Sequence, residues 1–422
     1  MKKLLTISFA VLSFYGKAQT ATPTTAATAE KEWDVSLYGF VRSDYIWDTR
    51  KSAQVREYNL NLYPLDKALD ANGTDLNDTG SSNFLAIVSR LGVKVKGPNV
   101  WGAKMTGNLE GDFFGNTEST IGLFRLRHAT INMEWQKTTL TMGQTWYPTF
   151  IPEVFPGVAN FNTGILFNPF GWASQVRLKQ NLTKELSFAL TAYKEREFTT
   201  PAANGANQNA ASTNSALPTL HGQFQYKYKN WIAGLGAEYK SEQPLTVSNG
   251  LASTQKVNTS SVVGYFKYSN DKFSVKGYGI TGKNMYNLVM LGGFAGYTDP
   301  SGIEKYEASK TTSYWIDIAS NGKKIAPGLF FGKTTNGGTG KDGASAFYMR
   351  GINGTSTAST RVIDNVWRLS GRVDFKQNKF RVSPEVEYTT ATWGDLKSDG
   401  SAGDNAKDVS NVRILVSCVY AF

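Results

Sequence analysis

A two-residue period in hydropathy, along segments of ten to fifteen residues, is the feature that most constrains this chain. From Trp33 to Trp47, apolar residues such as Leu37 alternate with polar residues such as Arg42. The same alternation recurs in segments 85–95 and 101–113. Successive side chains of a β-strand point to opposite faces, so each segment is expected to be a strand with one apolar and one charged face. Soluble β-sandwiches and membrane barrels both contain such strands, and alternation alone leaves both open.

The lengths of the connections between these segments favour a barrel, because short and long connections alternate along the chain. The short ones are 96–100, 136–137, 181–184, 229–230, 269–272, 321–322 and 376–379. The long ones are 48–82, 114–120, 148–170, 199–217, 241–256, 284–310, 335–360 and 394–407. Short periplasmic turns opposite long extracellular loops are typical of transmembrane barrels. We therefore expect an all-β fold, a transmembrane antiparallel β-barrel of about sixteen strands formed by residues 33–422.

The N-terminal sequence predicts export. Lys2 and Lys3 precede an apolar stretch from Leu4 to Tyr15, and a small-residue cleavage site ends at Ala18. We expect residues 1–18 to be a signal peptide, residues 19–32 a Thr/Ala-rich linker, and the outer membrane of a Gram-negative bacterium the destination. After Tyr15 no run approaches the roughly 18 apolar residues of a spanning helix.

Aromatic residues give two further expectations for a membrane barrel. Tryptophans near strand ends are expected to lie at the membrane interfaces; they are Trp33, Trp47, Trp101, Trp135, Trp146, Trp172, Trp231 and Trp393. Phe422 ends the last alternating segment. It looks like the C-terminal signal that the barrel-insertion machinery reads.

The polar strand faces would line the lumen, and they are rich in arginine. The residues expected there are Arg42, Asp44, Arg90, Lys104, Glu110, Asp112, Arg125, Arg127, Arg177, Arg368, Arg372, Arg381 and Arg413. Arginine binds carboxylate and phosphate through a planar fork. Removal of the signal peptide would lower the net charge of +11 to about +8, which favours anions. Because acidic residues such as Glu385 and Glu387 are interleaved, a lattice of ion pairs that stiffens the wall explains any single arginine equally well.

The segment from Leu123 to Trp135 departs from simple alternation, because its apolar face changes partway along. We expect a β-bulge near His128–Thr130. Arg125 and Arg127 are assigned to the lumen, since each would cost about 2–4 kcal/mol in lipid at the bilayer midplane.

The connection after the fifth expected strand, from Tyr147 to Phe170, is too apolar and too rich in proline to extend freely into water. It is the third extracellular loop by count. In trimeric porins that loop folds inward and narrows the channel, so we expect a constriction formed by Pro148, Phe150, Pro152, Glu153, Phe155, Asn160, Asn162 and Phe170. The alternative is packing against a neighbouring subunit or an external partner. The apolar stretch from Asn284 to Tyr297 is either a second inward loop or a partner-binding surface.

Motifs for other chemistry are weak. Gly277–Gly282 has dinucleotide-binding spacing but lacks a helix–strand context. Loop 66–78 contains Asp70, Asp75 and Asp78 and offers oxygen ligands for calcium, although Asp75 occupies the glycine position of an EF-hand loop. No other metal or cofactor, no enzymatic activity and no nucleic-acid partner are expected.

Several sequence strings resemble the DcaP-like porins as they appear in Bacteroidetes. They are Ser89–Pro98, Gly107–Gly115, Leu126–Ala129, Gly143–Trp146 and Phe155–Gly157, and the resemblance is good over roughly residues 33–180. It implies a trimeric outer-membrane channel that favours small anionic solutes, and it supports Arg42, Arg90, Arg125 and Arg127 as channel-lining.

Two functional hypotheses follow. The first is a passive porin for small hydrophilic solutes with a preference for anions. It would act as a homotrimer, contact lipid and lipopolysaccharide, and be assembled by the barrel-insertion machinery. The second is an accessory barrel plugged by its own loops, which docks a partner through the Asn284–Tyr297 stretch.

Overall fold

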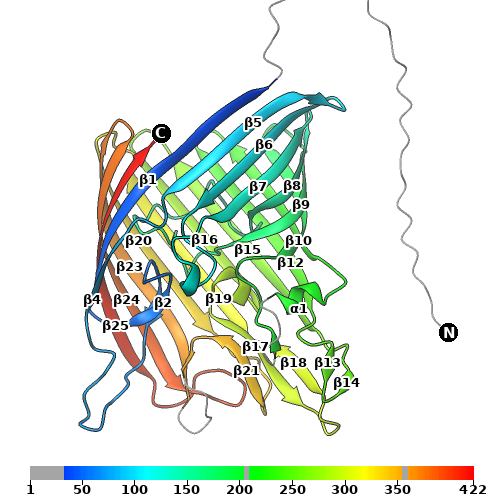
Figure 1. Ribbon diagram of the computed structural model, residues 1–422, viewed down its shortest axis with the longest axis vertical. Helices are drawn as coiled ribbons and strands as arrows, with labels where there is room; N and C mark the ends of the chain where they lie inside the picture. Colours follow the sequence, from blue (N-terminus) through cyan, green and yellow to red (C-terminus); the bar gives the residue numbers. More distant parts are fainter. Residues whose placement is uncertain (1–32, 204–208, 354–359) are drawn as a thin grey trace, which may run out of the picture. The chain divides into compact units, whose positions relative to one another are not determined.

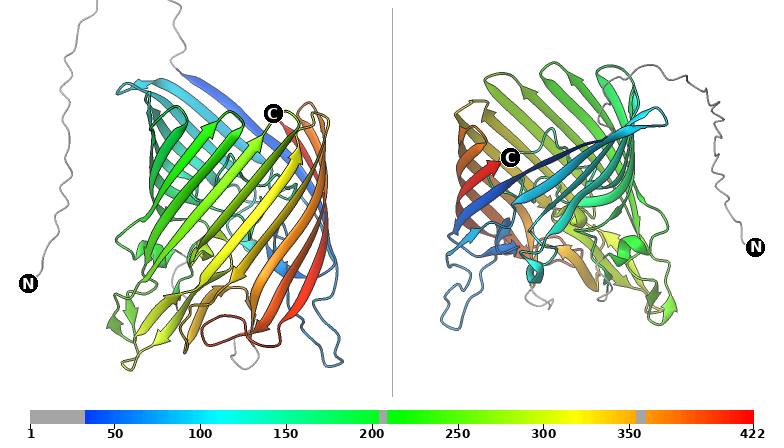
Figure 2. Two further views of the ribbon diagram at one scale, coloured as in Figure 1. Left: turned by 180° about the vertical axis from the view of Figure 1, so that it is seen from behind. Right: turned by 45° about the horizontal axis from the view of Figure 1, so that its top comes forward.

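An antiparallel sheet that closes on itself dominates the computed structural model, which describes residues 33–203, 209–353 and 360–422 (Figures 1 and 2). The expected signal peptide and linker lie outside these residues. Sixteen long strands form the wall: β1 (Asp34–Asp48), β5 (Arg90–Val100), β6 (Ala103–Asp112), β7 (Arg125–Glu134), β8 (Thr138–Trp146), β9 (Trp172–Asn181), β10 (Leu186–Glu195), β11 (Thr219–Tyr228), β12 (Trp231–Glu242), β15 (Val257–Ser269), β16 (Phe273–Lys283), β19 (Lys310–Ser320), β20 (Ile325–Asn336), β23 (Arg361–Gln377), β24 (Phe380–Asp395) and β25 (Lys407–Ala421). Two short strands, β4 (Ser81–Leu85) and β22 (Ile352–Asn353), extend positions in this wall. The expected barrel of about sixteen strands is confirmed.

The first and last strands close the barrel. β1 pairs with β25 from Phe40↔Ala421 to Asp48↔Arg413, and the backbone N–H of Phe422 donates to the carbonyl of Gly39 over 3.1 Å. Closure satisfies the backbone groups that an open sheet edge would expose to lipid.

Alternation along each strand separates an outer from an inner face, as the sequence predicts. On β1, Leu37 and Val41 are 67% and 60% exposed on the outer surface, whereas Arg42 and Asp44 point inward and are buried. An apolar outer band with a polar interior is the arrangement that a bilayer requires.

The short connections all lie at one end of the barrel and the long loops at the other, so the expected polarity is confirmed (Figure 1). The first turn differs in detail from its expected position at 96–100. β5 continues to Val100, with a register shift after Gly97, and the chain turns at Trp101 and Gly102, which have φ values of 52° and 75°. Pro98 lacks a donor and is therefore accommodated at this irregularity.

The expectation that every strand-end tryptophan lies at a membrane interface is wrong for three of them. Trp172 and Trp393 are fully buried inside the barrel, and Trp146 stacks on Trp172 with ring centroids 4.4 Å apart. Trp101 and Trp231, by contrast, are exposed. The buried rings are on lumen-facing strand positions, where inward-folded loops cover them, and proximity to a strand end does not reveal this.

The irregularity in β7 lies slightly earlier than expected. Glu110 of β6 pairs with His128 and Gly111 pairs with Leu126, so Arg127 is the inserted residue, rather than one within His128–Thr130. The bulge places the consecutive residues Arg127 and His128 both on the inner side, so Arg125 and Arg127 lie inside the barrel while Leu126 and, after the shift, Ile131 face outward.

The extracellular loops contain the remaining elements, which are β2 (Ser52–Val55), β3 (Leu60–Pro64), η1 (Glu118–Thr120), α1 (Ala210–Thr213), β13 (Val247–Ser248), β14 (Leu251–Ala252), η3 (Tyr286–Leu288), β17 (Gly292–Thr298), β18 (Glu304–Ala308) and β21 (Ala346–Arg350). β17, β18 and β21 form a separate three-stranded sheet. No helix among the described residues is long and apolar enough to cross a bilayer. Parts of three loops instead enter the barrel and build a hydrophobic core there, with Leu60, Phe167 and Leu291 fully buried in it.

Candidate functional site

The third extracellular loop, residues 147–171 between β8 and β9, folds into the lumen as expected. Its first part is held by β16, because the Tyr278 hydroxyl donates to the carbonyl of Thr149 over 2.8 Å. Its last part is held by β19, because the Trp315 indole N–H donates to Asn168 Oδ1 over 3.1 Å. Phe167 then packs against Phe330 of β20 with ring centroids 6.0 Å apart.

The centre of this loop is fixed to the opposite wall. Arg42 of β1 donates to the carbonyl of Ala159 over 2.7 Å, and the backbone N–H of Asn160 donates to Glu385 Oε2 of β24 over 2.8 Å. Lys276 of β16 donates to the carbonyl of Phe155 over 3.0 Å. Charged groups on three distant strands therefore hold the loop across the lumen.

Of the residues expected to form a constriction, five are buried by these contacts; they are Pro148, Phe150, Asn160, Asn162 and Phe170. Pro152, Glu153 and Phe155 are exposed on the loop. Glu153 accepts hydrogen bonds of 2.8 Å from both Lys227 and Gln225 of β11. The surrounding lumen partly shields this carboxyl from water, which opposes ionisation, but the hydrogen bonds hold the pKa of Glu153 below its usual value.

Residues 284–291, the first part of the stretch from Asn284 to Tyr297, form a second inward segment, and the rest of the stretch belongs to β17 of the separate three-stranded sheet. Met285 and residues 288–291 are buried, and the carbonyl of Leu288 accepts a hydrogen bond of 3.0 Å from the backbone N–H of Phe170. Of the two alternatives that the sequence leaves open, an inward loop is the one observed for residues 284–291.

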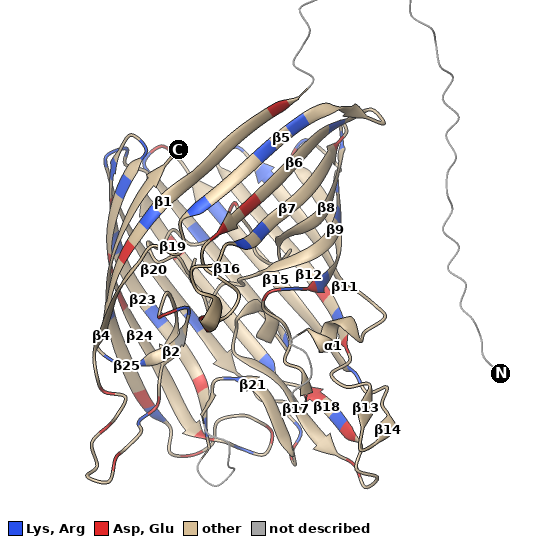
Figure 3. Cartoon of the chain, viewed as in Figure 1, with Lys and Arg blue, Asp and Glu red and all other residues tan. Residues whose placement is uncertain are grey.

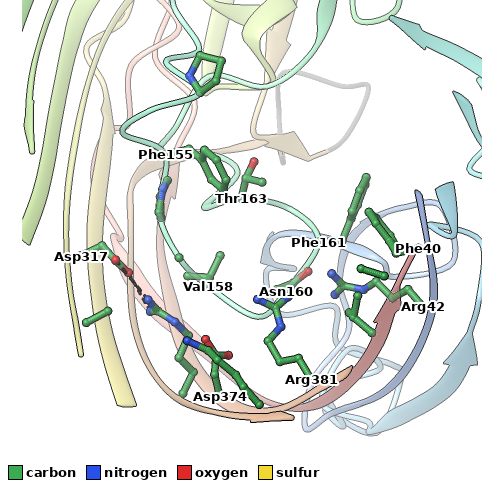
Figure 4. Close-up of a pocket in the computed structure, with 18 of the residues that line it drawn as sticks. Phe40, Arg42, Phe155, Val158, Asn160, Phe161, Thr163, Asp317, Asp374 and Arg381 are labelled. Atoms are coloured by element: carbon green, nitrogen blue, oxygen red, sulfur yellow. Dashed lines mark hydrogen bonds and ion pairs between the residues drawn. The ribbon is translucent and has the colours of Figure 1, made fainter. Parts of the chain in front are cut away.

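On the periplasmic side of the third loop lies a cavity of about 790 Å³ (Figure 4). It extends to the short turns, where Asn321 and Asn378 line it. Loop residues, among them Phe155 and Phe161, form one side. The wall forms the other and supplies an excess of positive charge. Eight lining residues are basic and two, Asp317 and Asp374, are acidic; the basic ones are Arg42, Arg90, Arg127, Lys276, Arg372, Lys376, Lys379 and Arg381.

The acidic side chains of the cavity already have partners. Asp317 receives two hydrogen bonds from Arg372, of 2.8 and 3.3 Å, and Asp374 accepts one of 2.6 Å from Ser383. Arg381 points into the cavity near Asn160 (Figure 4), and its Nε has no hydrogen-bond partner in the described part of the chain. Because this Nε is itself buried, a small anion in the cavity would meet the positive charge of the Arg381 guanidinium rather than this donor.

Arg125 and Arg127 belong to a compact ion-pair network rather than to open water. Arg125 Nε lies 2.7 Å from Asp112, while Arg127 bonds Glu110 at 2.8 Å and Asp112 at 3.0 Å. The guanidinium of Arg127 also lies 4.5 Å from the Trp172 ring centroid. Arg125 is covered by loops, and Arg127 contributes to the cavity wall.

A second network reinforces the seam of the barrel. Arg413 donates to Asp48 over 2.9 and 2.8 Å, and Arg42 bonds Asp44 at 2.8 Å. Arg368 donates to Thr389 over 2.8 Å. The ion-pair lattice that the sequence offers as an alternative is thus present beside the open basic cavity.

The other expected lumen residues lie on inward strand faces at different heights. Arg90 Nε is 3.5 Å from Glu110, Arg177 donates to Gln175 over 2.8 Å, and Lys104 is exposed near the periplasmic end of β6.

The sequence interpretation did not single out Lys276, Asp317, Asp374, Lys376 or Lys379, all of which line the cavity. Period-two alternation along β16, β19 and β23 could have placed Lys276, Asp317 and Asp374 on the inner face. On the extracellular side of the third loop lies a buried cluster in which Lys240 Nζ is 3.3 Å from Glu195 and 2.9 Å from Asn287. The sequence gives no signal for it, because its members come from two strands and an inward loop.

In loop 66–78, the carboxylate of Asp75 accepts hydrogen bonds from Arg50 at 2.8 Å and from the backbone of Ala68 at 3.0 Å. Across the described ranges, no group of three His, Cys, Asp or Glu side chains is arranged to hold a metal ion.

Comparison with known proteins agrees with this architecture. The DcaP channel of Acinetobacter baumannii superposes with a TM-score of 0.65 at 16% identity, covering 94% of this chain and 100% of that one. An anion-selective porin of Comamonas acidovorans gives 0.54 at 14% identity, covering 93% and 100%, and OmpF of Salmonella typhi gives 0.52 at 11%, covering 92% and 97%. At such identities the likeness shows the fold.

No curated protein matches the chain in sequence. A family model described as "DcaP outer membrane protein" matches residues 11–308, which is more than half of the chain. The closed barrel, its inward third loop and this match together show that the chain belongs to the DcaP outer membrane protein family.

Proposed function

We propose that the protein is an outer-membrane porin through which small hydrophilic solutes diffuse, with a preference for anions. The observation that carries the anion preference is the cavity on the periplasmic side of the third loop, which eight basic and two acidic residues line. Four of the basic residues, Arg42, Arg90, Arg127 and Arg372, are paired with carboxylates. The other four, Lys276, Lys376, Lys379 and Arg381, form no ion pair among the described residues and leave the cavity with a positive excess. A positively charged wall raises the local concentration of anions and lowers that of cations. The anion-selective porin of Comamonas acidovorans has the same fold and supports the proposal.

The chemistry of the cavity favours carboxylates and phosphates. Arginine presents donors in a fixed fork, and lysine adds mobile point charges. Aromatic rings from the third loop, such as Phe155 and Phe161, line the same space and give an apolar surface beside the cations. Small organic anions with an apolar part therefore fit better than bare inorganic ions.

Swelling of proteoliposomes tests this function. Vesicles that contain the full chain are placed in isosmotic solutions of an organic anion or an organic cation of equal size, each with an impermeant counterion and a matched ionophore. We expect faster swelling with the anion. Equal rates, or a faster rate with the cation, would contradict the anion preference, and no swelling at all would contradict the porin function.

The alternative function, an accessory barrel that docks a partner protein, has no exposed docking surface at the expected place. It relied on the Asn284–Tyr297 stretch, and the apolar side chains of this segment are buried within the protein.

We further propose a homotrimer, as the resemblance to DcaP-like porins implies. On the outer wall, β5 to β8 form an apolar groove of about 510 Å³ whose floor includes Gly107, Ala129 and Gly143. Small residues let another barrel approach closely. The closer assignment to a Bacteroidetes type, cleavage after Ala18, recognition of Phe422 by the insertion machinery, lipopolysaccharide contact and a calcium ion in loop 66–78 stay predictions.

A further inference from the structure

Lysine residues mark the periplasmic end of the barrel. Six of the seven turns contain at least one; these lysines are Lys137, Lys184, Lys229, Lys272, Lys323, Lys324 and Lys379, and all are exposed. The same turns contain two acidic residues, Glu185 and Asp271. The periplasmic rim is therefore strongly positive.

The extracellular end of the barrel carries the opposite charge. In the extracellular loops acidic residues outnumber basic ones, as in loop 66–78 with its four aspartates and one lysine. Figure 3 shows blue segments at several turns along the top of the barrel and red segments in the loops below. Because the excess of lysine is confined to one end, a general need for net charge does not explain it.

These lysines lie directly beside the apolar outer band. Lys272, Lys324 and Lys379 each precede an exposed apolar residue, which is Phe273, Ile325 or Phe380. Lys229 follows the exposed Tyr228, with its Nζ 5.1 Å from the centre of that ring, and lies near the exposed Trp231. Aromatic rings and lysines at the end of an apolar band lie at the height of lipid headgroups.

We propose that this rim binds the phosphate groups of anionic phospholipids in the inner leaflet of the outer membrane. The lysines are distributed around the circumference, with one or two in six of the seven turns. A planar anionic surface can contact all of these lysines at once. A folded acidic protein that contacted all of them would cover the mouth of the cavity and block the diffusion of solutes. Lysines held at a membrane surface attract anionic lipids within the Debye length.

Quenching of tryptophan fluorescence by brominated lipids measures this preference. Trp101 and Trp231 are exposed at the periplasmic end and serve as reporters. The full-length protein is reconstituted in phosphatidylethanolamine vesicles that contain a minor fraction of brominated phosphatidylglycerol, or of brominated phosphatidylethanolamine. We expect an apparent affinity about fivefold higher for phosphatidylglycerol, the factor that one lysine contributes at an anionic surface, and a decrease of this preference in high salt.

The test variant changes five turn lysines to glutamine, namely Lys137, Lys184, Lys272, Lys323 and Lys324. Lys229 and Lys379 are kept, because they line cavities next to the third loop. The matched control removes the same charge from the extracellular loops by changing Lys51, Lys67, Lys256, Lys341 and Lys397 to glutamine. Folding of both variants is verified by heat-modifiable migration in gels.

We expect the turn variant to lose most of the preference for phosphatidylglycerol, since only Lys229 and Lys379 remain, and the loop variant to keep it, while both keep the solute uptake of the unmodified protein. Equal quenching by the two brominated lipids in the unmodified protein would overturn the proposal. It would also fail if both variants lost the preference equally, or if the rim captured a soluble acidic protein while showing no preference among lipids.

Discussion

Arg413→Met is expected to destabilise the barrel strongly, because Arg413 and Asp48 are direct partners across the β1–β25 seam. Both side chains are almost completely buried, and two hydrogen bonds of 2.9 and 2.8 Å join them. Without the guanidinium, the buried carboxylate would retain, among the described residues, only the 2.6 Å hydrogen bond from Asn411. Removal of one partner from such a pair costs about 3–5 kcal/mol.

The same barrel offers a matched control. Lys96 and Asp34 are also cross-strand partners, 3.7 Å apart, but their side chains are 71% and 63% exposed. Lys96→Met should cost less than about 1 kcal/mol, because water screens exposed pairs. The double change Arg413→Met with Asp48→Leu removes the unpaired charge, and it should recover about half of the loss or more.

Urea-induced unfolding of the full chain in phospholipid vesicles, followed by tryptophan fluorescence, gives the free energy of unfolding of each variant. A loss for Arg413→Met no larger than that for Lys96→Met would refute the reasoning. A double variant less stable than Arg413→Met would refute it as well, since the cost would then not come from the unpaired carboxylate.

Three further predictions concern the loop, the outer wall and assembly. The pKa of Glu153 is depressed in the folded protein, so its bonds to Lys227 and Gln225 should be complete above the ordinary glutamate pKa and be lost as the pH falls through the lower folded-state value. Single-channel current noise should rise in that acidic range, and Glu153→Gln should make the noise independent of pH there; the same pH response in the variant would contradict this. A Cβ at Gly107 would meet no atom closer than 3.8 Å, so Gly107→Trp should leave the barrel folded but convert trimers to monomers, as light scattering in detergent would show. A trimeric Gly107→Trp protein would exclude this face as the interface. Phe422→Ala should slow the appearance of the heat-modifiable form in cells more than Tyr420→Ala does, and equal rates would argue against a signal at the terminus.

The strands of the barrel wall could be predicted from the sequence alone, because every strand must present apolar side chains to lipid on one face and polar side chains to the lumen on the other. A residue such as Leu37 must face lipid while its neighbour must not, so a period of two places Arg42, Arg90 and Arg413 inside without any tertiary information. The third loop could also be predicted, since a stretch from Tyr147 to Phe170 with so many apolar residues needs a surface to pack against.

The pairing of lumen side chains could not be predicted in the same way. The sequence assigns Arg125 and Arg381 to the same environment, the lumen, yet Arg125 is neutralised by Asp112 whereas the Nε of Arg381 has no partner among the described residues. That difference depends on which strands are adjacent and on where the loops lie. Trp172 and Trp393 illustrate the same point, because only the inward loops convert a strand end from a membrane interface into a core.

The reversal potential across a planar bilayer under a potassium chloride gradient tests the central claim most directly. The basic cavity predicts a potential of the sign that chloride selectivity produces. Changing Lys376, Lys379 and Arg381 to glutamine should move it toward zero, whereas the loop change Lys397→Gln should leave it in place. A potential of the sign of potassium selectivity in the unmodified protein, or one that the triple change does not move, would contradict the account.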